Sequence, residues 1–350
     1  MPLQTTVVGA YACADYLHLP TWFPDMKNCG PGIYDKYMES VDPQELETCI
    51  EKAEREVIGE QIDLGIDIIT DGELRRENYI WYFCRRIKAF DFKNLMWKEC
   101  RKGGWSADVP VIAGKIECPD DVTWIGEEWK KAQAKSSKPL KMTVPGPMTI
   151  ISTTANKYYS DEKELCQDLA IVINAHILQL VEAGCKHIQL DEPVFAREPA
   201  NALAYGMDNV VLCFQNVGPN VARYIHLCRG YPDYMDHDDY VKADKGSYLK
   251  LADKLDGLGF DGISIEDAEC KNDLSLLDHF KKSKIILGSV TVARSRVEST
   301  QEIRSRLQEA LKHIPAERLL VAPDCGLGFL PRDILKQKLA NMVTAAKSLP

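Results

Sequence analysis

The sequence lacks the features that mark several classes of protein. No run of about 18 consecutive apolar residues occurs, so we expect no membrane-spanning helix. The N-terminal segment has neither the basic region nor the apolar region of a secretory signal peptide. Basic charge is in deficit, because 43 Lys and Arg residues face 52 Asp and Glu residues, and the net charge of −9 disfavours nucleic acid as a partner. We therefore expect a cytoplasmic protein that binds neither nucleic acid nor a membrane.

Paired cysteines are also missing. The chain has 12 cysteines, but they are scattered and no two of them form a CxxC pair. A chain of 350 residues without a secretion signal is a poor candidate for a disulfide framework. Most of these cysteines are therefore expected to be small buried hydrophobic residues. No internal repeat or low-complexity segment is present either.

What the sequence does contain is an alternation of short apolar runs and helical patterns. Helical periodicity predicts helices over 42–65, 161–183, 245–258 and 300–313, and a last one around 334–343. The apolar runs predict eight strands, over 5–11, 66–73, 141–147, 187–193, 222–230, 262–266, 283–290 and 319–325. Eight strands alternating with helices predict an α/β fold, a parallel (β/α)8 TIM barrel.

We expect residues 1–350 to form this one barrel domain. A Trp-rich insertion of about 80–138 interrupts it after the second strand and holds five of the six tryptophans. The mixture of aromatic, charged and glycine residues there favours a β-rich or irregular segment that covers one end of the barrel. Its polar tail, 130–138, is predicted to be a loop.

Two residues with metal-ligating side chains lie in the fifth predicted strand. His226 and Cys228 are two positions apart, and alternate residues of a strand point to the same face. A His-x-Cys pair alone more often belongs to the packing of a strand. Glu266 and Cys325, however, end the sixth and eighth strands, and such strand ends meet at the rim of a barrel. Two thiolates, one imidazole and one carboxylate are a plausible tetrahedral set for zinc, so we predict a Zn²⁺ site.

This ligand set favours a particular chemistry. With Zn²⁺ it would carry a formal charge of about −1, because three of the four ligands are anionic. Such a centre activates water poorly, since its ligands already donate charge. It still lowers the pKa of a bound thiol and leaves the thiolate nucleophilic, so it favours alkylation of a thiol over hydrolysis.

Two carboxylates stand at other predicted strand ends. Glu73 follows the second strand and Asp191 ends the fourth. They could act as helix N-caps or form salt bridges with Arg75, Arg76 or Arg197. Alternatively, they hold the ammonium group of a substrate. The residues alone leave both interpretations open.

Taken together, the strand-end motifs resemble the catalytic C-terminal barrel of cobalamin-independent methionine synthase. The matching segments are collinear and span nearly the whole chain: Thr5–Gly9, Asp71–Glu73, Gly146–Thr149, Ile188–Pro193, His226–Cys228, Ile263–Glu266 and Pro323–Leu327. The resemblance implies a zinc site formed by His226, Cys228, Glu266 and Cys325. It also implies that Glu73 and Asp191 contact the amino group of a homocysteine-like acceptor. Gly9 is assigned to substrate binding on the same ground.

The sequence departs from that family at three points. Ala10 stands where the family has a serine, and no tryptophan follows Thr149 where the family stacks its folate. The segment Val292–Arg296 contains no counterpart of the family's proton-donating histidine. These departures disfavour a polyglutamyl folate as methyl donor. The His-x-Cys-Arg-Gly segment is more similar to the short relatives, which include archaeal-type core methionine synthases and epoxyalkane:coenzyme M transferases.

Our leading hypothesis is a zinc-dependent methyltransferase or alkyltransferase acting on a small-molecule thiol, with Arg229, Arg294 or Arg296 binding an anionic part of donor or acceptor. One alternative is an epoxide-opening transferase that uses a thiol like coenzyme M. That acceptor has a sulfonate and no amine, so arginines would matter more than Asp191. The other alternative is a non-catalytic barrel in which zinc serves only to bind thiols or to hold the structure.

Overall fold

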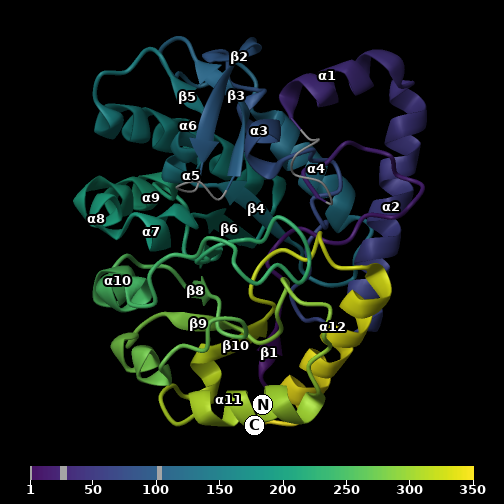
Figure 1. Ribbon diagram of the computed structural model, residues 1–350, viewed down its shortest axis with the longest axis vertical. Coiled ribbons are helices and arrows are strands. Elements are labelled where there is room, and N and C mark those ends of the chain that lie inside the picture. Colours follow the sequence, from purple (N-terminus) through teal and green to yellow (C-terminus); the bar gives the residue numbers. More distant parts are fainter. Residues whose placement is uncertain (1, 24–29, 101–104) are drawn as a thin grey trace.

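The computed structural model describes residues 2–23, 30–100 and 105–350. Its main sheet has seven strands, all parallel. In spatial order they are β1 (Gln4–Thr5), β10 (Leu319–Ala322), β9 (Lys284–Gly288), β8 (Gly262–Ile265), β7 (Ala222–Leu227), β6 (His187–Asp191) and β4 (Lys141–Pro145). The sheet occupies the centre of the molecule and helices surround it (Figure 1). The predicted α/β class and parallel sheet are confirmed.

The predicted second strand, 66–73, is wrong as a strand. This segment makes only two single-residue parallel bridges, from Ile68 to Thr6 and from Ile69 to Leu140. The physical reason is that side chains take up the backbone groups that a ladder would use. The Asp67 carboxylate accepts the backbone N–H of Thr5 at 2.8 Å. The Gln61 amide bonds both the N–H and the carbonyl of Thr70, at 3.0 and 2.9 Å.

The five predicted helices are present; four lie within their predicted bounds, and the last extends beyond them, from Arg332 to Lys347. The long helices around the sheet are α2 (Pro43–Asp63), α6 (Glu162–Ala183), α10 (Ser247–Asp256), α11 (Thr300–Ala310) and α12 (Arg332–Lys347). Shorter helices are α1 (Pro31–Ser40), α3 (Tyr79–Cys84), α5 (Pro147–Ser152), α7 (Val194–Arg197), α8 (Pro199–Asn201) and α9 (Met207–Cys213). One π-helical turn (Ala202–Gly206) and two 3₁₀ turns (Leu274–His279 and Ala316–Arg318) are also present, and a further helix lies in the predicted insertion.

Within the predicted insertion, a long hairpin lies at one end of the molecule, opposite the two chain termini (Figure 1). Strands β2 (Phe90–Cys100) and β3 (Trp105–Ile112) pair antiparallel, and β5 (Ala155–Asn156) adds to β3. Residues 101–104 of the insertion lie outside the described residues. The predicted loop at 130–138 is wrong at its start, because α4 (Thr123–Gln133) continues to Gln133.

Helix α6 is long and apolar enough to cross a membrane, by length and composition alone. Half of its 18-residue apolar window is buried inside the protein. It packs against α4 and α9, with Leu165, Leu169 and Ile173 fully buried. Its apolar character is therefore that of a core helix.

Candidate active site

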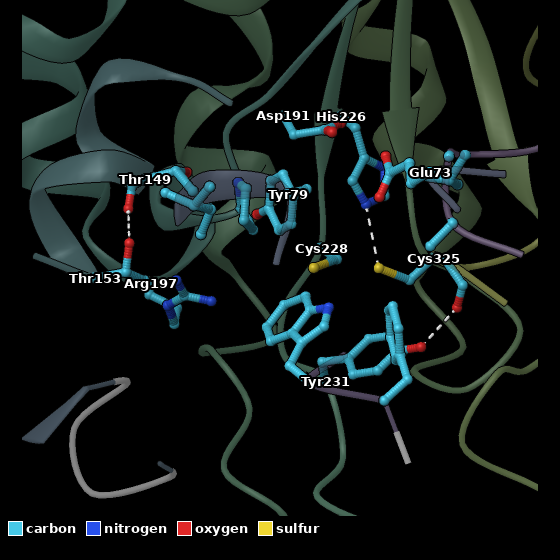
Figure 2. A pocket seen from close by; sticks show the side chains of 18 residues that line it. Glu73, Tyr79, Thr149, Thr153, Asp191, Arg197, His226, Cys228, Tyr231 and Cys325 are labelled. Atoms are coloured by element: carbon cyan, nitrogen blue, oxygen red, sulfur yellow. Dashed lines mark hydrogen bonds between the residues drawn. The ribbon is translucent and has the colours of Figure 1, made fainter. Parts of the chain in front are cut away.

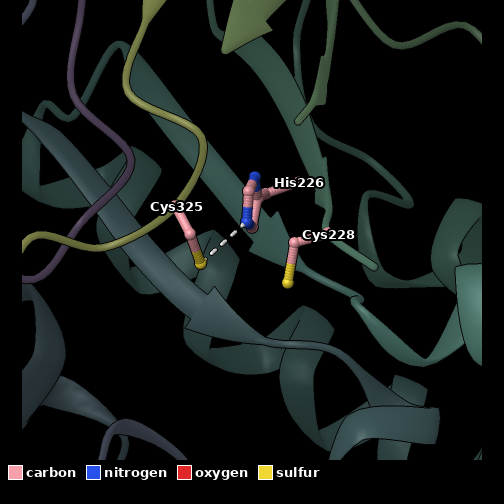
Figure 3. A group of neighbouring side chains, drawn as sticks. All are labelled: His226, Cys228 and Cys325. Atoms are coloured by element: carbon pink, nitrogen blue, oxygen red, sulfur yellow. Dashed lines mark hydrogen bonds between the residues drawn. The ribbon is translucent and has the colours of Figure 1, made fainter. Parts of the chain in front are cut away.

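Three ligand-type side chains converge at the C-terminal ends of the strands (Figure 3). His226 is the penultimate residue of β7, Cys228 follows that strand, and Cys325 lies three residues beyond β10. The His226 Nε2 atom lies 3.5 Å from the Cys325 Sγ atom, and the three ligand atoms lie within 4.8 Å of one another. Ligands bound to one tetrahedral zinc ion are separated by about 3.6 Å, as follows from bond lengths of about 2.0–2.3 Å. The cluster therefore has the spacing of a metal site.

The strand register orients the His226 ring. Ser264 of β8 is the residue paired with His226, and its Oγ atom lies 2.8 Å from Nδ1. Because Nδ1 is engaged in this hydrogen bond, Nε2 is left to face the two thiols. A ligating histidine ordinarily has such a partner on its second nitrogen, which fixes both tautomer and ring orientation.

The two thiols differ in their acidity. The contact with Cys325, together with the neighbouring His226, holds the pKa of Cys228 well below its usual value. The same contact and burial raise the pKa of Cys325. The two thiols therefore interact directly. A divalent cation could bind both sulfurs as thiolates.

Glu266, the fourth predicted ligand, is not among these three converging groups. Its side chain is 3% exposed, and its Oε1 atom has no hydrogen-bond partner in the described protein. Burial, and the acidic neighbours Asp324 and Cys228, raise the pKa of Glu266 to about 8. The Arg229 guanidinium and the Lys242 ammonium each lie 4.0 Å from this atom, too far for a hydrogen bond, so a cation bound closer could offset more of its desolvation cost.

Arg229 supports Glu266 and does not line the cavity described below. Its backbone N–H donates to the Glu266 Oε2 atom at 3.0 Å. Its guanidinium donates to the Ala243 carbonyl at 2.7 and 3.0 Å, and lies 4.0 Å from the Glu266 Oε1 atom. This places Arg229 behind the site.

Glu73 is held in an unusual local geometry. Its backbone φ is +58°, and its side chain is 9% exposed. The Thr143 hydroxyl donates to the Glu73 Oε1 atom at 2.6 Å, and the Arg76 guanidinium lies 3.7 Å from the same atom. Burial, partly offset by Arg76, raises the pKa of Glu73 to about 7. Gly9 makes room for this carboxylate, since a Cβ atom there would lie 2.3 Å from Oε1.

A chain of buried polar groups fixes the second carboxylate, Asp191. Gln189 lies two residues earlier on β6, and its amide N–H donates to the Asp191 Oδ1 atom at 2.7 Å. The amide oxygen of Gln189 accepts from the Lys141 ammonium at 2.5 Å, and Lys141 also donates to the Val7 carbonyl at 2.6 Å. Burial lowers the pKa of Lys141 to about 7 and raises that of Asp191. The Gln189 amide N–H groups donate to Asp191 and, at 2.9 Å, to the Val8 carbonyl, so the amide oxygen faces Lys141.

One cavity contains most of the predicted site. Among its lining residues are Gly9, Glu73, Asp191, His226, Cys228 and Cys325. In Figure 2 the two sulfurs lie between Glu73 and His226 on one side and Tyr231 on the other. The structure thus brings to one cavity residues at or beyond the ends of β1, β6, β7 and β10, together with Glu73 from the segment 66–73.

The sequence analysis missed the aromatic residues that line this cavity. We call Trp22, Phe23, Tyr79 and Tyr231 the aromatic wall. The Trp22 and Tyr231 rings are nearly parallel, with centroids 6.4 Å apart, and Phe23 packs edge-on to Tyr231 at 5.9 Å. The signal that could have found them is their position, because each lies in a segment that follows a predicted strand.

The other two predicted substrate-binding arginines do not line the cavity. Arg294 forms ion pairs with Glu269, at 2.8 Å, and with Asp238. Arg296 pairs with Glu302 at 2.9 Å, and its side chain is 65% exposed. Binding of an anionic substrate group by either residue stays a prediction.

Glu192 is a buried carboxylate that accepts hydrogen bonds from the first turn of α5. It accepts from the Thr149 hydroxyl at 2.6 Å and from the Met148 N–H at 3.1 Å. Burial raises the pKa of Glu192 to about 8. The pKa of Glu192 is therefore higher in the folded protein than in the unfolded chain. The contribution of Glu192 to the free energy of unfolding is complete below about pH 4.5 and is lost as the pH rises through about 8.

We therefore expect Glu192→Gln to flatten the pH dependence of stability. In the wild type, titration of Glu192 makes the free energy of unfolding fall by at most ~1.4 kcal/mol per pH unit between about pH 5 and 8, and the variant should lack this fall. Urea unfolding at four pH values in that range measures it. Glu317→Gln, at an exposed position, is the control and should leave the slope unchanged. Parallel curves for wild type and Glu192→Gln would contradict the assignment.

Comparisons with known proteins bear on this site. Residues 34–348 match the family model described as the catalytic domain of cobalamin-independent synthase. A protein named methionine synthase from Sulfolobus acidocaldarius is 30% identical, over 97% of this chain and 90% of its own. Another of that name, from Saccharolobus solfataricus, is 30% identical over 99% of this chain and 94% of its own.

Solved structures of similar fold exist. A B12-independent methionine synthase from Shewanella sp. W3-18-1, in complex with selenomethionine, superposes with a TM-score of 0.86 at 24% identity, covering 99% of this chain and 98% of that one. A putative B12-independent methionine synthase from Listeria monocytogenes gives a TM-score of 0.74 at 19% identity, with the same coverage. At these identities the structures establish a common fold.

Proposed function

This chain belongs to the family of cobalamin-independent synthase catalytic domains, and we propose that it is a zinc-dependent enzyme that transfers a methyl group to the thiol of homocysteine or a similar aminothiol. The observation that carries the proposal is the cluster of His226, Cys228 and Cys325 at the strand ends. The family relatives named methionine synthase support the reaction class.

His226, Cys228 and Cys325 would hold the zinc ion, and Glu266 would supply a fourth ligand. The fit rests on the spacing of the three groups and on the buried Oε1 atom of Glu266, which lacks a hydrogen-bond partner. When bound, zinc lowers the pKa of an acceptor thiol so that the thiolate predominates at neutral pH. The Ser264 hydroxyl engages the Nδ1 atom of His226, which would leave Nε2 to hold the ion.

Glu73 and Asp191 would bind the ammonium group of the acceptor. Both carboxylates line the cavity that contains the sulfurs, and both are nearly buried. A buried ammonium–carboxylate hydrogen bond is stronger than a neutral one, so two of them would orient the acceptor with its sulfur toward the cysteines. Lys141 and Gln189 hold Asp191 in place for this role.

We also propose that the sheet acts as a closed eight-unit barrel, with the segment at Ile68 and Ile69 as its eighth member. The two bridges that join this segment to Thr6 and Leu140 support this. The donor is proposed to be other than a polyglutamyl folate. No tryptophan follows Thr149, where Ile150 and Ile151 stand instead.

Asp191→Asn tests the acceptor assignment. We expect KM for homocysteine to rise about 10- to 100-fold, because a hydrogen bond to a charged group is lost. KM for 4-mercaptobutanoate, which has no amine, should change little. Steady-state kinetics with both thiols, using methyl iodide as a common methyl source, measures the difference.

Adding 2-mercaptoethanesulfonate to this experiment distinguishes the proposed function from the epoxide-opening alternative. If the wild-type enzyme prefers 2-mercaptoethanesulfonate over homocysteine, and Asp191→Asn leaves both KM values unchanged, the aminothiol assignment fails. The present geometry favours the aminothiol, because Arg229 is engaged with Ala243 and Glu266, and Arg294 with Glu269.

A further inference from the structure

The aromatic wall lies where a methyl donor would have to approach. In the proposed function the acceptor's ammonium group sits at Glu73 and Asp191, and its sulfur sits beside Cys228 and Cys325. Tyr231 lies across the two sulfurs from Glu73 (Figure 2). In a direct displacement the leaving atom lies in line with the attacking sulfur, on the far side of the methyl carbon. The methyl group and the leaving atom therefore face aromatic rings.

The charge of the cavity favours a cation at this position. The described lining contains two carboxyls, Glu73 and Asp191, and two thiols, against one guanidinium, that of Arg197. Arg197 lies away from the sulfurs, beside Thr153 (Figure 2). The faces of aromatic rings are electronegative and attract cations, and Trp does so most strongly. Four rings beside an acidic cavity are therefore a suitable site for an onium group and a poor one for an anion.

The chemistry of the leaving group also favours a cationic methyl donor. A donor that loses an amine or an alkoxide leaves a basic atom that needs a proton. The wall contains two hydroxyls, those of Tyr79 and Tyr231, and the Tyr231 hydroxyl already donates to the Gly326 carbonyl at 2.8 Å. A cationic donor loses a neutral group and needs no proton. Reaction of a thiolate with a cation also neutralises charge, so surroundings poor in water favour it.

We propose that the methyl donor is a methylsulfonium cation held beside the aromatic wall, of which Trp22 and Tyr231 line the cavity. The proposal rests on the proposed function and specifies its second substrate. The acceptor thiolate forms a bond to the methyl carbon while the bond from that carbon to the sulfonium sulfur breaks. The electron pair of the broken bond stays on the departing sulfur, which leaves as a neutral thioether, and no redox partner is required.

The remainder of such a donor has room beside the wall. A second cavity of ≈ 570 Å³ shares Trp22, Phe23 and Tyr79 with the first. Its lining extends to Asp15 and Arg332, which are charges of opposite sign. A sulfonium donor with a polar substituent could therefore place its methyl group in the first cavity and its substituent in the second.

The first experiment uses wild-type enzyme loaded with zinc and supplied with homocysteine. Three methyl sources are compared: trimethylsulfonium, 5-methyltetrahydrofolate and methyl iodide, which is small enough to react without recognition by the wall. We expect methionine from trimethylsulfonium and methyl iodide, and at least tenfold less from the folate. Methyl iodide turnover without sulfonium turnover would overturn this inference and leave the proposed function standing. No acceleration with any source would overturn both.

The second experiment tests the aromatic wall itself. Choline and its uncharged analogue 3,3-dimethylbutan-1-ol compete with trimethylsulfonium, and we expect choline to inhibit at least tenfold more strongly. Trp22→Leu and Tyr231→Leu should raise KM for trimethylsulfonium about tenfold, a larger effect than either has on the rate with methyl iodide. Tyr231→Phe, which keeps the ring, and Trp97→Leu, at a position 66% exposed on β2, are the controls. Equal inhibition by the two competitors would overturn the proposal.

Discussion

Replacing Cys325 with serine is expected to abolish both zinc retention and thiol methylation. A serine hydroxyl keeps its proton at neutral pH and is a hard ligand, so it cannot replace a thiolate on zinc. The Cys325 Sγ atom lies 3.5 Å from the His226 Nε2 atom. Among the described residues, Cys228 is the one other cysteine in the cluster of possible metal ligands. Loss of a residue that hydrogen-bonds to a metal ligand lowers metal affinity or activity about 10- to 100-fold, and loss of a ligand itself should lower them further.

The measurement is zinc content after dialysis, together with the rate of homocysteine methylation by methyl iodide. Cys49→Ser is the matched control, since Cys49 is also a partly buried free cysteine but lies on helix α2. We expect it to keep its zinc and its activity. Far-ultraviolet circular dichroism shows whether Cys325→Ser is folded. A folded Cys325→Ser protein that retains one equivalent of zinc and near-normal activity would remove the basis of the mechanism.

Gly9→Ala is expected to raise KM for homocysteine about 10- to 100-fold, although Gly9 carries no functional group. The added Cβ atom would lie 2.3 Å from the Glu73 Oε1 atom and 3.1 Å from the Thr143 Cγ2 atom. Because Thr143 is part of a buried strand, the Glu73 carboxylate is the group that must move. Displacing a substrate-orienting group by about 1 Å lowers the rate of the reaction on the order of a hundredfold.

A second glycine separates this effect from a general loss of stability. Gly59 lies within helix α2, and a Cβ atom there would meet nothing within 4 Å. Gly59→Ala should therefore leave the kinetics unchanged and stabilise the helix by about 1 kcal/mol. For Gly9→Ala, an acceptor without an amine should be affected far less than homocysteine. If both acceptors lose activity equally, Glu73 is not the group through which Gly9 acts.

The strand-end residues were predictable because two local rules place them. Side chains alternate along a strand, so His226 and Cys228 face the same way, and parallel strands end at a common edge, so Asp191 and Cys325 come near them. Both rules need only residue spacing. The cavity that contains Glu73, Asp191, His226, Cys228 and Cys325 agrees with them.

Other features required contacts between distant parts of the chain. The segment 66–73 resembles a strand in its apolar residues, yet Asp67 and Gln61 take hydrogen bonds that a ladder would have used. Arg229 follows the ligand pair directly, yet it turns toward Ala243. No spacing rule predicts such partners, because each depends on how separate loops and helices pack.

The sequence by itself determined the parallel α/β fold and the residues that gather at its rim, because hydrophobic periodicity and strand direction are written locally along the chain. Only the tertiary structure decided which groups support that rim: the Lys141–Gln189 pair beneath Asp191, and the aromatic wall opposite Glu73. These groups come from strands and loops far apart in sequence, and only their packing in the folded chain sets the distances between them.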